Sequence, residues 1–103
     1  MNEHLRSLPI IREDKGFSGT FYIGADNDRL AELAFSSPNS HLLIIRHVEV
    51  ADKLKGQGIG TKLVQEAVDW VMQKNMKVFP ICPFAREQFR KHPQWSNVLK
   101  QRE

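Results

Sequence analysis

Three glycines within five residues, Gly56, Gly58 and Gly60, directly precede a segment with helical periodicity. Glycine within a helix or strand lowers stability by about 1 kcal/mol relative to alanine. Three glycines so close together therefore indicate that side chains are not tolerated at these positions. From Ile59 onward apolar residues recur at every third or fourth position, which predicts an amphipathic helix of about sixteen residues. The N–H groups and the dipole at the start of such a helix form an anion site, so the sequence predicts a phosphate-binding loop.

Two apolar runs flank this loop and helix and predict strands. They are HLLIIRHVEV at 41–50 and KVFPIC at 77–82. Pro80 places the second strand at an edge, or leaves it without partners there, because proline has no N–H for a ladder. Strand, loop, helix and strand form a βαβ unit, in which we expect parallel neighbouring strands and a right-handed crossover.

The remaining segments complete an α+β, or mixed α/β, fold. Apolar and β-branched runs alternate with turn residues in the first half, which predicts an antiparallel meander of strands 8–12, 17–24, 30–36 and 41–50. The turn ADND, at 25–28, is the firmest hairpin signal. Pro83 begins a further helix that ends at His92, and 95–99 predict a last turn. Residues 1–103 therefore constitute one domain, with four antiparallel strands, the βαβ unit and a short C-terminal helical segment.

Composition and charge limit the function classes. A chain of 103 residues has room for one core, and no apolar run has the length of a membrane span. The N-terminus lacks the apolar run of a signal peptide, and the one cysteine, Cys82, cannot form an internal disulfide, so we expect a cytoplasmic protein without membrane contact. Basic residues predominate after Asp69, as a solvated helix face or as a site for an anionic ligand. The sequence argues against nucleic-acid binding, because no aromatic stripe is interleaved with Arg and Lys on a sheet.

The glycine loop matches neither of two common phosphate-binding motifs. In a P-loop, Lys and then Ser or Thr follow the last glycine, whereas Thr61 here precedes Lys62. A dinucleotide fingerprint has the spacing GxGxxG and an acidic residue about twenty positions later. The spacing here is GxGxG, and no acidic residue occurs between Gln73 and Arg86.

The segment from Lys55 to Gly60 instead resembles the acyl-CoA loop of the GNAT N-acetyltransferase superfamily. That pattern is Arg or Gln, two residues, Gly, one residue, and then Gly or Ala, and Lys55 departs from it at the first position. Lysine can pair with phosphate as a point charge but lacks the bidentate fork of arginine. The resemblance extends to HVEV before the loop and to KVFPICPF and HPQW after the helix. Together these segments are similar to the small single-domain GNAT-like family.

The resemblance implies that acetyl-CoA, or CoA, lies where the two parallel strands splay apart. The thioester would then point toward Cys82, and no metal is implied. The implied cofactor-binding residues are Val48, Val50, Lys55, Gly56, Gln57, Gly58, Ile59, Gly60, Thr61 and Pro83.

Three side chains are candidates for catalysis. Period two places His47 and Glu49 on one face of their strand, where either could accept a proton from an acceptor amine. Cys82 stands before a predicted helix start that would stabilise its thiolate, and we expect it to face His47 across the two parallel strands. Each also has a purely structural interpretation, which for Cys82 is burial as a hydrophobe. Trp70 and Trp95 are interpreted as core residues rather than as a ligand cover.

Two functions remain open from the sequence. The first is an N-acetyltransferase that transfers acetyl to an unidentified amine, directly or through Cys82, with slow turnover on generic amines. The alternative is a CoA-binding or regulatory module without catalysis, which the small size favours. The sequence predicts neither the acceptor nor the oligomeric state.

Overall fold

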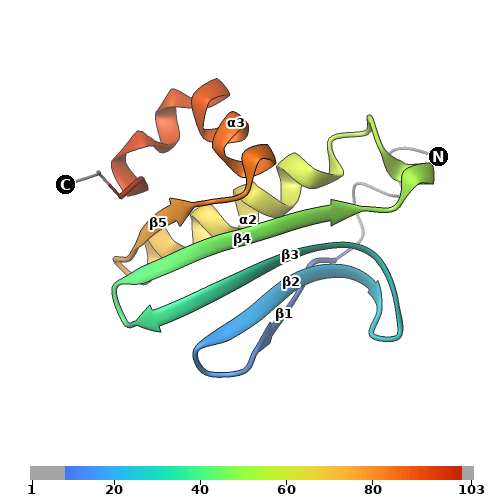
Figure 1. Cartoon of the computed structure of the whole chain (residues 1–103), viewed down its shortest axis with the longest axis horizontal. Coiled ribbons are helices and arrows are strands. Elements are labelled where there is room, and N and C mark those ends of the chain that lie inside the picture. The colour runs from blue at the N-terminus through green and yellow to red at the C-terminus, as the bar shows by residue number, and fades with distance from the viewer. Residues whose placement is uncertain (1–8, 101–103) are drawn as a thin grey trace.

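Five strands form one sheet in the order β1-β2-β3-β4-β5 in the computed structural model, which describes residues 9–100. The strands are Ile11–Asp14 (β1), Ser18–Ala25 (β2), Asp28–Asn39 (β3), Leu42–Val50 (β4) and Lys77–Pro80 (β5). Neighbours are antiparallel from β1 to β4, whereas β4 and β5 are parallel (Figure 1). The predicted meander, its hairpin at 25–28 and the parallel pair of the βαβ unit are confirmed.

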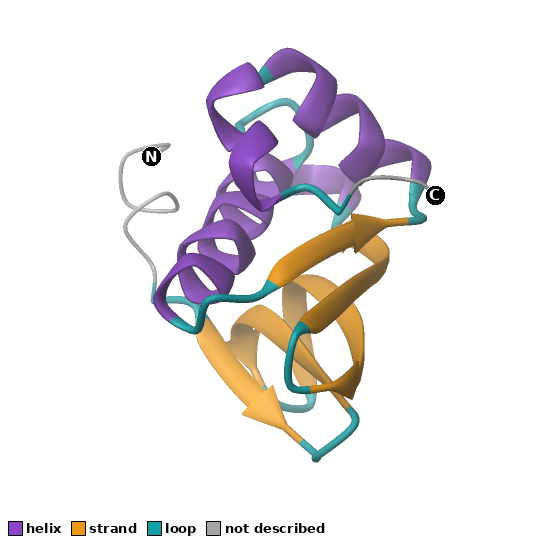
Figure 2. Ribbon diagram, turned by 90° about the vertical axis from the view of Figure 1, so that its left-hand side faces the viewer, coloured by secondary structure: helices purple, strands orange, loops and turns teal. Residues whose placement is uncertain are grey.

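The helices gather to one side of the strands (Figure 2). They are α2 (Ile59–Gln73), α3 (Pro83–Lys91) and the 3-10 helices η1 (Asp52–Leu54) and η2 (Pro93–Val98). The helix expected from Ile59 is confirmed at 15 residues. Leu99 follows η2 and makes a parallel bridge to Val78, so the chain returns to the outer edge of β5. Among residues 9–100, no helix has the length and hydropathy needed to cross a membrane.

The core lies between the sheet and α2. The residues that meet there are fully or almost fully buried, and among them are Leu33, Phe35, Leu43, Ile45, Leu63, Val64, Ala67 and Val71. Trp70 packs against the Phe35 ring with centroids 6.1 Å apart, and Trp95 stacks on His92 at 4.1 Å. Trp95 is a core residue, and Trp70 is partly buried against the core, so neither lines the cavities as a cover for a ligand.

A β-bulge in β4 decides which residues face the core. Ala34 pairs with His47 and Phe35 pairs with Ile45, so Arg46 has no partner of its own in β3. The extra residue reverses the alternation, and the buried face that ends at Ile45 continues at Val48. His47 and Glu49 consequently share the other face, which confirms the prediction from period two.

Several predicted boundaries need correction. The strand expected at 8–12 is β1 at Ile11–Asp14, and Leu8 lies outside the described residues. The strand expected at 77–82 ends at Pro80. The N–H groups of Ile81 and Cys82 both donate to the Ile45 carbonyl, at 3.1 and 3.4 Å, so the ladder stops there. Cys82 thus caps α3 instead of ending a strand.

Candidate functional site

A cavity of about 590 Å³ opens beyond the point where β4 and β5 part. The last paired residues of the two strands are Ile45 and Pro80. The cavity is lined by Val48, Val50, Leu54, Lys55, Gly56, Gly58, Ile59, Gly60, Thr61 and Phe84. Eight of the ten predicted cofactor residues are in this set, and only Gln57 and Pro83 are not.

The glycines in the loop meet two different requirements. Gly56 and Gly58 have φ of 82° and 78°, a left-handed backbone that favours glycine, and a Cβ on either would meet no atom within 4 Å. A Cβ on Gly60 would lie 2.7 Å from Cζ of Phe84, so this glycine makes room for an aromatic ring. The space above Gly56 and Gly58 is open, as a cradle for a ligand requires.

The start of α2 offers unsatisfied donors to that space. Within residues 9–100, no backbone N–H from Gly56 to Thr61 donates a hydrogen bond to the protein, and the first bond of the helix is from Lys62 to the Gly58 carbonyl at 3.0 Å. The first turn carries no acidic residue and no side-chain cap. The positive end of the helix dipole is therefore uncompensated, which suits an anion such as pyrophosphate.

Lys55 stands at the rim of this cradle. Its Nζ lies 3.0 Å from Oδ1 of Asp52, and both side chains are exposed. An exposed ion pair of this kind contributes only about 0.2 to 1 kcal/mol, so a phosphate could replace the carboxylate at low cost. Neighbouring Gln57 donates weakly to the Lys53 carbonyl at 3.5 Å, and its buried Oε1 has no partner among the described residues.

Three features of the site were missed from the sequence. Leu54, buried in η1, and Phe84 complete the cavity wall. The Thr61 hydroxyl donates to Oε1 of Gln88 at 2.8 Å, and so joins the start of α2 to the middle of α3. Gln88 is the one buried polar side chain among the described residues, at 7% exposure. Gln88 lies in a polar stretch of sequence, so the sequence did not indicate that its side chain would be buried.

His47 and Glu49 lie together on the face of the sheet opposite α2. Nε2 of His47 is 3.8 Å from Oε1 of Glu49, and the side chains are 51% and 74% exposed. Glu32 on β3 pairs with Glu49 across the strands, and one ligand atom from each of these three side chains lies within 4.8 Å of the others. The group can accept a proton or attract a cation.

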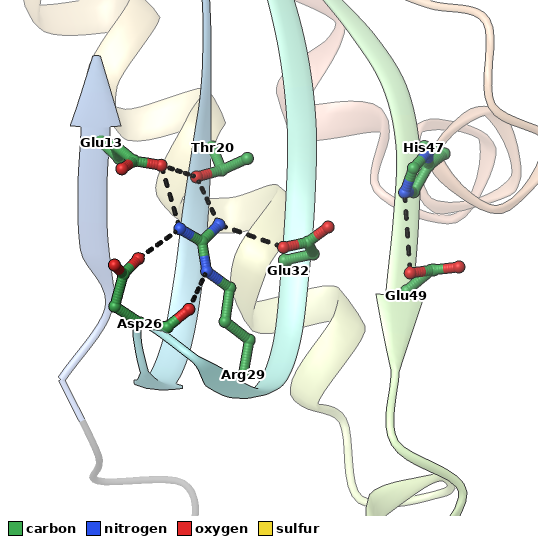
Figure 3. A network of polar contacts seen from close by, with 7 residues as sticks. All are labelled: Glu13, Thr20, Asp26, Arg29, Glu32, His47 and Glu49. Atoms are coloured by element: carbon green, nitrogen blue, oxygen red, sulfur yellow. Dashed lines mark hydrogen bonds and ion pairs between the residues drawn. The ribbon is translucent and has the colours of Figure 1, made fainter. Parts of the chain in front are cut away.

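Glu32 also belongs to a network centred on Arg29, which the sequence gave no reason to expect (Figure 3). The guanidinium donates to Asp26, Glu13 and Glu32 at 2.8, 3.0 and 3.1 Å, and to the Thr20 hydroxyl at 3.0 Å. It also lies over the Tyr22 ring, 3.9 Å from the centroid. The hydrogen bonds that Arg29 donates to Asp26, Glu13 and Glu32 hold its pKa above the usual range, with the bond to Asp26 as the largest cause.

Cys82 lies apart from these groups. Its side chain is 6% exposed within the core cluster, and it is not among the residues that line the cavity. Among residues 9–100 no hydrogen bond joins Cys82 to His47, and its backbone lies beside Ile45. The structure thus places His47 beside Glu49, whereas Cys82 is buried and forms no hydrogen bond with either among the described residues.

Comparison with known proteins identifies the family. Residues 20–98 match the family model described as GCN5-related N-acetyl-transferase. A GCN5-like candidate N-acetyltransferase from Staphylococcus aureus is similar in structure with a TM-score of 0.70, 30% identity and 90% coverage of both chains.

More distant proteins share the fold. Tetrahymena GCN5 has a TM-score of 0.59 at 14% identity, covering 86% of this chain and 64% of its own. AAC(6′)-Iy, solved in complex with the bisubstrate analog CoA-S-monomethyl-acetylneamine, has a TM-score of 0.53 at 13% identity, covering 86% and 66%.

Two curated proteins named Protein NATD1, from Gallus gallus and Homo sapiens, are 26% identical over 74 residues, or 72% of this chain. The alignment spans 66% of the chicken protein and 65% of the human one. Family model, close structural relative and shared fold agree, and the chain belongs to the GCN5-related N-acetyltransferase family.

Proposed function

We propose that this protein binds acetyl-CoA and transfers its acetyl group to an amine. The observation that carries the proposal is the run of free N–H groups from Gly56 to Thr61, at the mouth of a cavity of about 590 Å³. Family membership supports acetyl transfer, and the CoA analog bound to AAC(6′)-Iy supports use of CoA in proteins of this fold.

Separate parts of the cavity would hold separate parts of the donor. The N–H groups and the helix dipole would bind the pyrophosphate, and Lys55 would leave Asp52 to pair with a phosphate oxygen. The apolar wall, formed by Val48, Val50 and Phe84, would contact the uncharged arm of the molecule.

Acetyl-CoA supplies an acetyl group that is activated as a thioester. For transfer, the acceptor nitrogen forms a bond to the acetyl carbon and loses a proton, and the carbon–sulfur bond breaks to release CoA as a thiolate, which takes up a proton from water or from the acceptor. His47 or Glu49 is exposed at the end of β4 and would accept that proton, directly or through water. The buried position of Cys82 favours this direct route over a relay through its thiol.

The test combines thiol release with intact-mass measurement in the presence of acetyl-CoA and a panel of primary amines. We expect acetylated amine, no stable acetylation of the protein, and turnover that survives Cys82→Ala. Removal of the general base, by His47→Ala or Glu49→Gln, should lower kcat by about a hundredfold to ten-thousandfold, the usual contribution of such a group. His41→Ala, which removes an exposed histidine at the β3–β4 turn, is the matched control.

The other outcomes identify the alternatives. An acetyl group on Cys82 that passes to the amine would establish the relay. Tight binding of acetyl-CoA without acetylation of any amine would establish a CoA-binding module. Because the acceptor side is open to water and can do little to orient an amine, we expect slow turnover on generic amines.

A further inference from the structure

Helix α3 contacts the start of α2 at two consecutive residues of the glycine loop. The Phe84 ring packs against Gly60, and Oε1 of Gln88 accepts a hydrogen bond from the Thr61 hydroxyl at 2.8 Å. Phe84 and Gln88 are four residues apart on α3, so their side chains lie on the same face of that helix. This face of α3 therefore lies against the helix start whose free N–H groups the proposed function assigns to the pyrophosphate.

Gln88 is held in place through its backbone as well as its side chain. Nδ1 of His92 lies 2.7 Å from the Gln88 carbonyl oxygen, and because a carbonyl only accepts, Nδ1 is the donor in this contact. His92 in turn stacks on the Trp95 ring with centroids 4.1 Å apart. The Gln88 side chain is 7% exposed, so the surrounding residues leave its amide little freedom to turn away from Thr61.

The hydrogen bond between Thr61 and Gln88 does something that an apolar contact between the two helices could not do. Replacing both partners of a buried hydrogen bond by apolar groups of the same shape changes stability little, so stability alone does not require this bond. Apolar contacts have no preferred direction, whereas a hydrogen bond weakens steeply when its angle changes. Among the residues that the structure describes, no other side-chain hydrogen bond reaches the first turn of α2. The bond therefore fixes the orientation of that turn.

We propose, on the basis of the proposed binding of acetyl-CoA, that Gln88 is a positioning residue for the pyrophosphate. It acts through the Thr61 hydroxyl and keeps the N–H groups at the start of α2 directed at the cradle before the ligand arrives. Because these donors are oriented in advance, less conformational freedom is lost when the phosphates bind. Gln88 is not among the residues that line the cavity, so we expect it to affect the ligand only through Thr61.

The first test compares acetyl-CoA with pantetheine, which lacks the pyrophosphate, in titrations followed by amide chemical shifts. Gln88→Leu should raise the Kd for acetyl-CoA about fivefold and leave the Kd for pantetheine unchanged. Thr61→Val removes the same hydrogen bond at a half-buried side chain and should have the same effect. Thr61→Ser keeps the hydroxyl and should bind acetyl-CoA as the wild type does. Equal losses for acetyl-CoA and pantetheine would overturn the inference.

A double variant and a control on the same helix separate orientation from stability. Thr61→Val and Gln88→Leu remove one and the same bond, so together they should raise the Kd for acetyl-CoA no further than either does alone. Phe89→Leu is the matched control, because Phe89 packs in the core against Trp95 and does not line the cavity. It should lower Tm and leave the Kd unchanged. A Kd that rises in Phe89→Leu as much as in Gln88→Leu would overturn the inference.

Turnover and a measurement without ligand distinguish this inference from the proposed function. Gln88→Leu should raise KM for acetyl-CoA and leave kcat near that of the wild type, because the reacting atoms are unaffected. In the absence of ligand, the NMR order parameters of the amides at 59–61 should be lower in Gln88→Leu than in Phe89→Leu. Wild-type affinity for acetyl-CoA in Gln88→Leu would overturn the inference and leave the proposed function intact. A wild-type protein that binds no acetyl-CoA would overturn the proposed function and this inference with it.

Discussion

At the scale of single residues, Gly58 and Gly60 have different reasons to be glycine. Gly58 adopts a left-handed backbone beneath open space, whereas Gly60 lies under the Phe84 ring. The glycine cluster in the sequence indicated that side chains are excluded here. The spacing of the glycines cannot show whether the reason is a left-handed backbone or a close contact with another side chain. The same limit applies to Arg29, whose partners come from β1, β2 and β3 and are joined only by the register of the sheet.

Gly58→Ala tests the cradle with little loss of structure. The added methyl group meets no atom within 4 Å, so the cost to stability is backbone strain of about 1 to 2 kcal/mol. The methyl would occupy the space proposed for phosphate, and we expect acetyl-CoA binding to weaken at least tenfold in calorimetric titration. Gly16→Ala is the matched control, because Gly16 also has a positive φ, of 93°, with open space, at the β1–β2 turn. An equal loss of affinity in both variants would contradict the phosphate role.

Lys55→Ala tests the charge at the rim. Loss of one screened phosphate contact should weaken acetyl-CoA binding about fivefold at low salt, and the effect should vanish near 1 M salt, where the Debye length is about 3 Å. Lys53→Ala, in the 3-10 helix that Lys55 follows, removes the same charge from a residue that does not line the cavity. A loss that is independent of salt would indicate a structural role for Lys55.

At the scale of elements, the order of the helices and strands could be predicted from the periodicity of apolar residues. The residues at which they end could not, because those ends depend on contacts between segments that are distant in sequence. The helix at Ile59–Gln73 was predictable because its apolar stripe has the period that faces a sheet. The bulge at Arg46 was not, because it depends on how β3 and β4 align. β5 ends at Pro80 because the Ile45 carbonyl receives both following N–H groups. Both features lie where β4 and β5 part, at the last pair of Ile45 and Pro80.

The junction between α2 and α3 gives a prediction at this scale. Thr61→Val removes the donor to Gln88 and leaves a buried amide oxygen unpaired, which should cost about 1 to 3 kcal/mol in urea unfolding. In a double-mutant cycle with Gln88→Leu, the double variant should lose less unfolding free energy than the two single variants lose together. The reason is that both polar groups are then absent and neither is left unpaired. Additive losses would show that the hydrogen bond does not couple the two helices.

At the scale of the whole molecule, the fold and most of the cavity wall were predictable because they follow the chain locally. The strand, loop and helix from His47 to Thr61 are contiguous, and eight of the ten predicted cofactor residues line one cavity. A second cavity, which contains Glu32, Glu49 and Asp52, could not be predicted, since Arg29 and Glu32 lie on β3, Glu49 at the end of β4 and Asp52 in η1. The burial of Cys82 could not be predicted either, because it depends on where β5 ends and on how α3 packs.

Ligand binding should stabilise the entire domain. A ligand that binds only the folded state at about ten times its Kd adds roughly 1.4 kcal/mol, which for a domain of this size raises Tm by about 6 to 11 °C. Thermal unfolding with acetyl-CoA should show this rise, and Gly58→Ala should show less of it at the same concentration. No change in Tm at saturating acetyl-CoA would contradict binding to the folded state.

The central claim is that the loop from Gly56 to Thr61 binds the phosphates of acetyl-CoA, and amide chemical shifts in a titration with CoA test it most directly. The account predicts that the largest saturable shifts fall on Gly56–Thr61, with smaller ones on Val48, Val50 and Phe84. Shifts confined to the basic surface of α3 around Arg86 and Arg90, with the glycine loop unaffected, would contradict it.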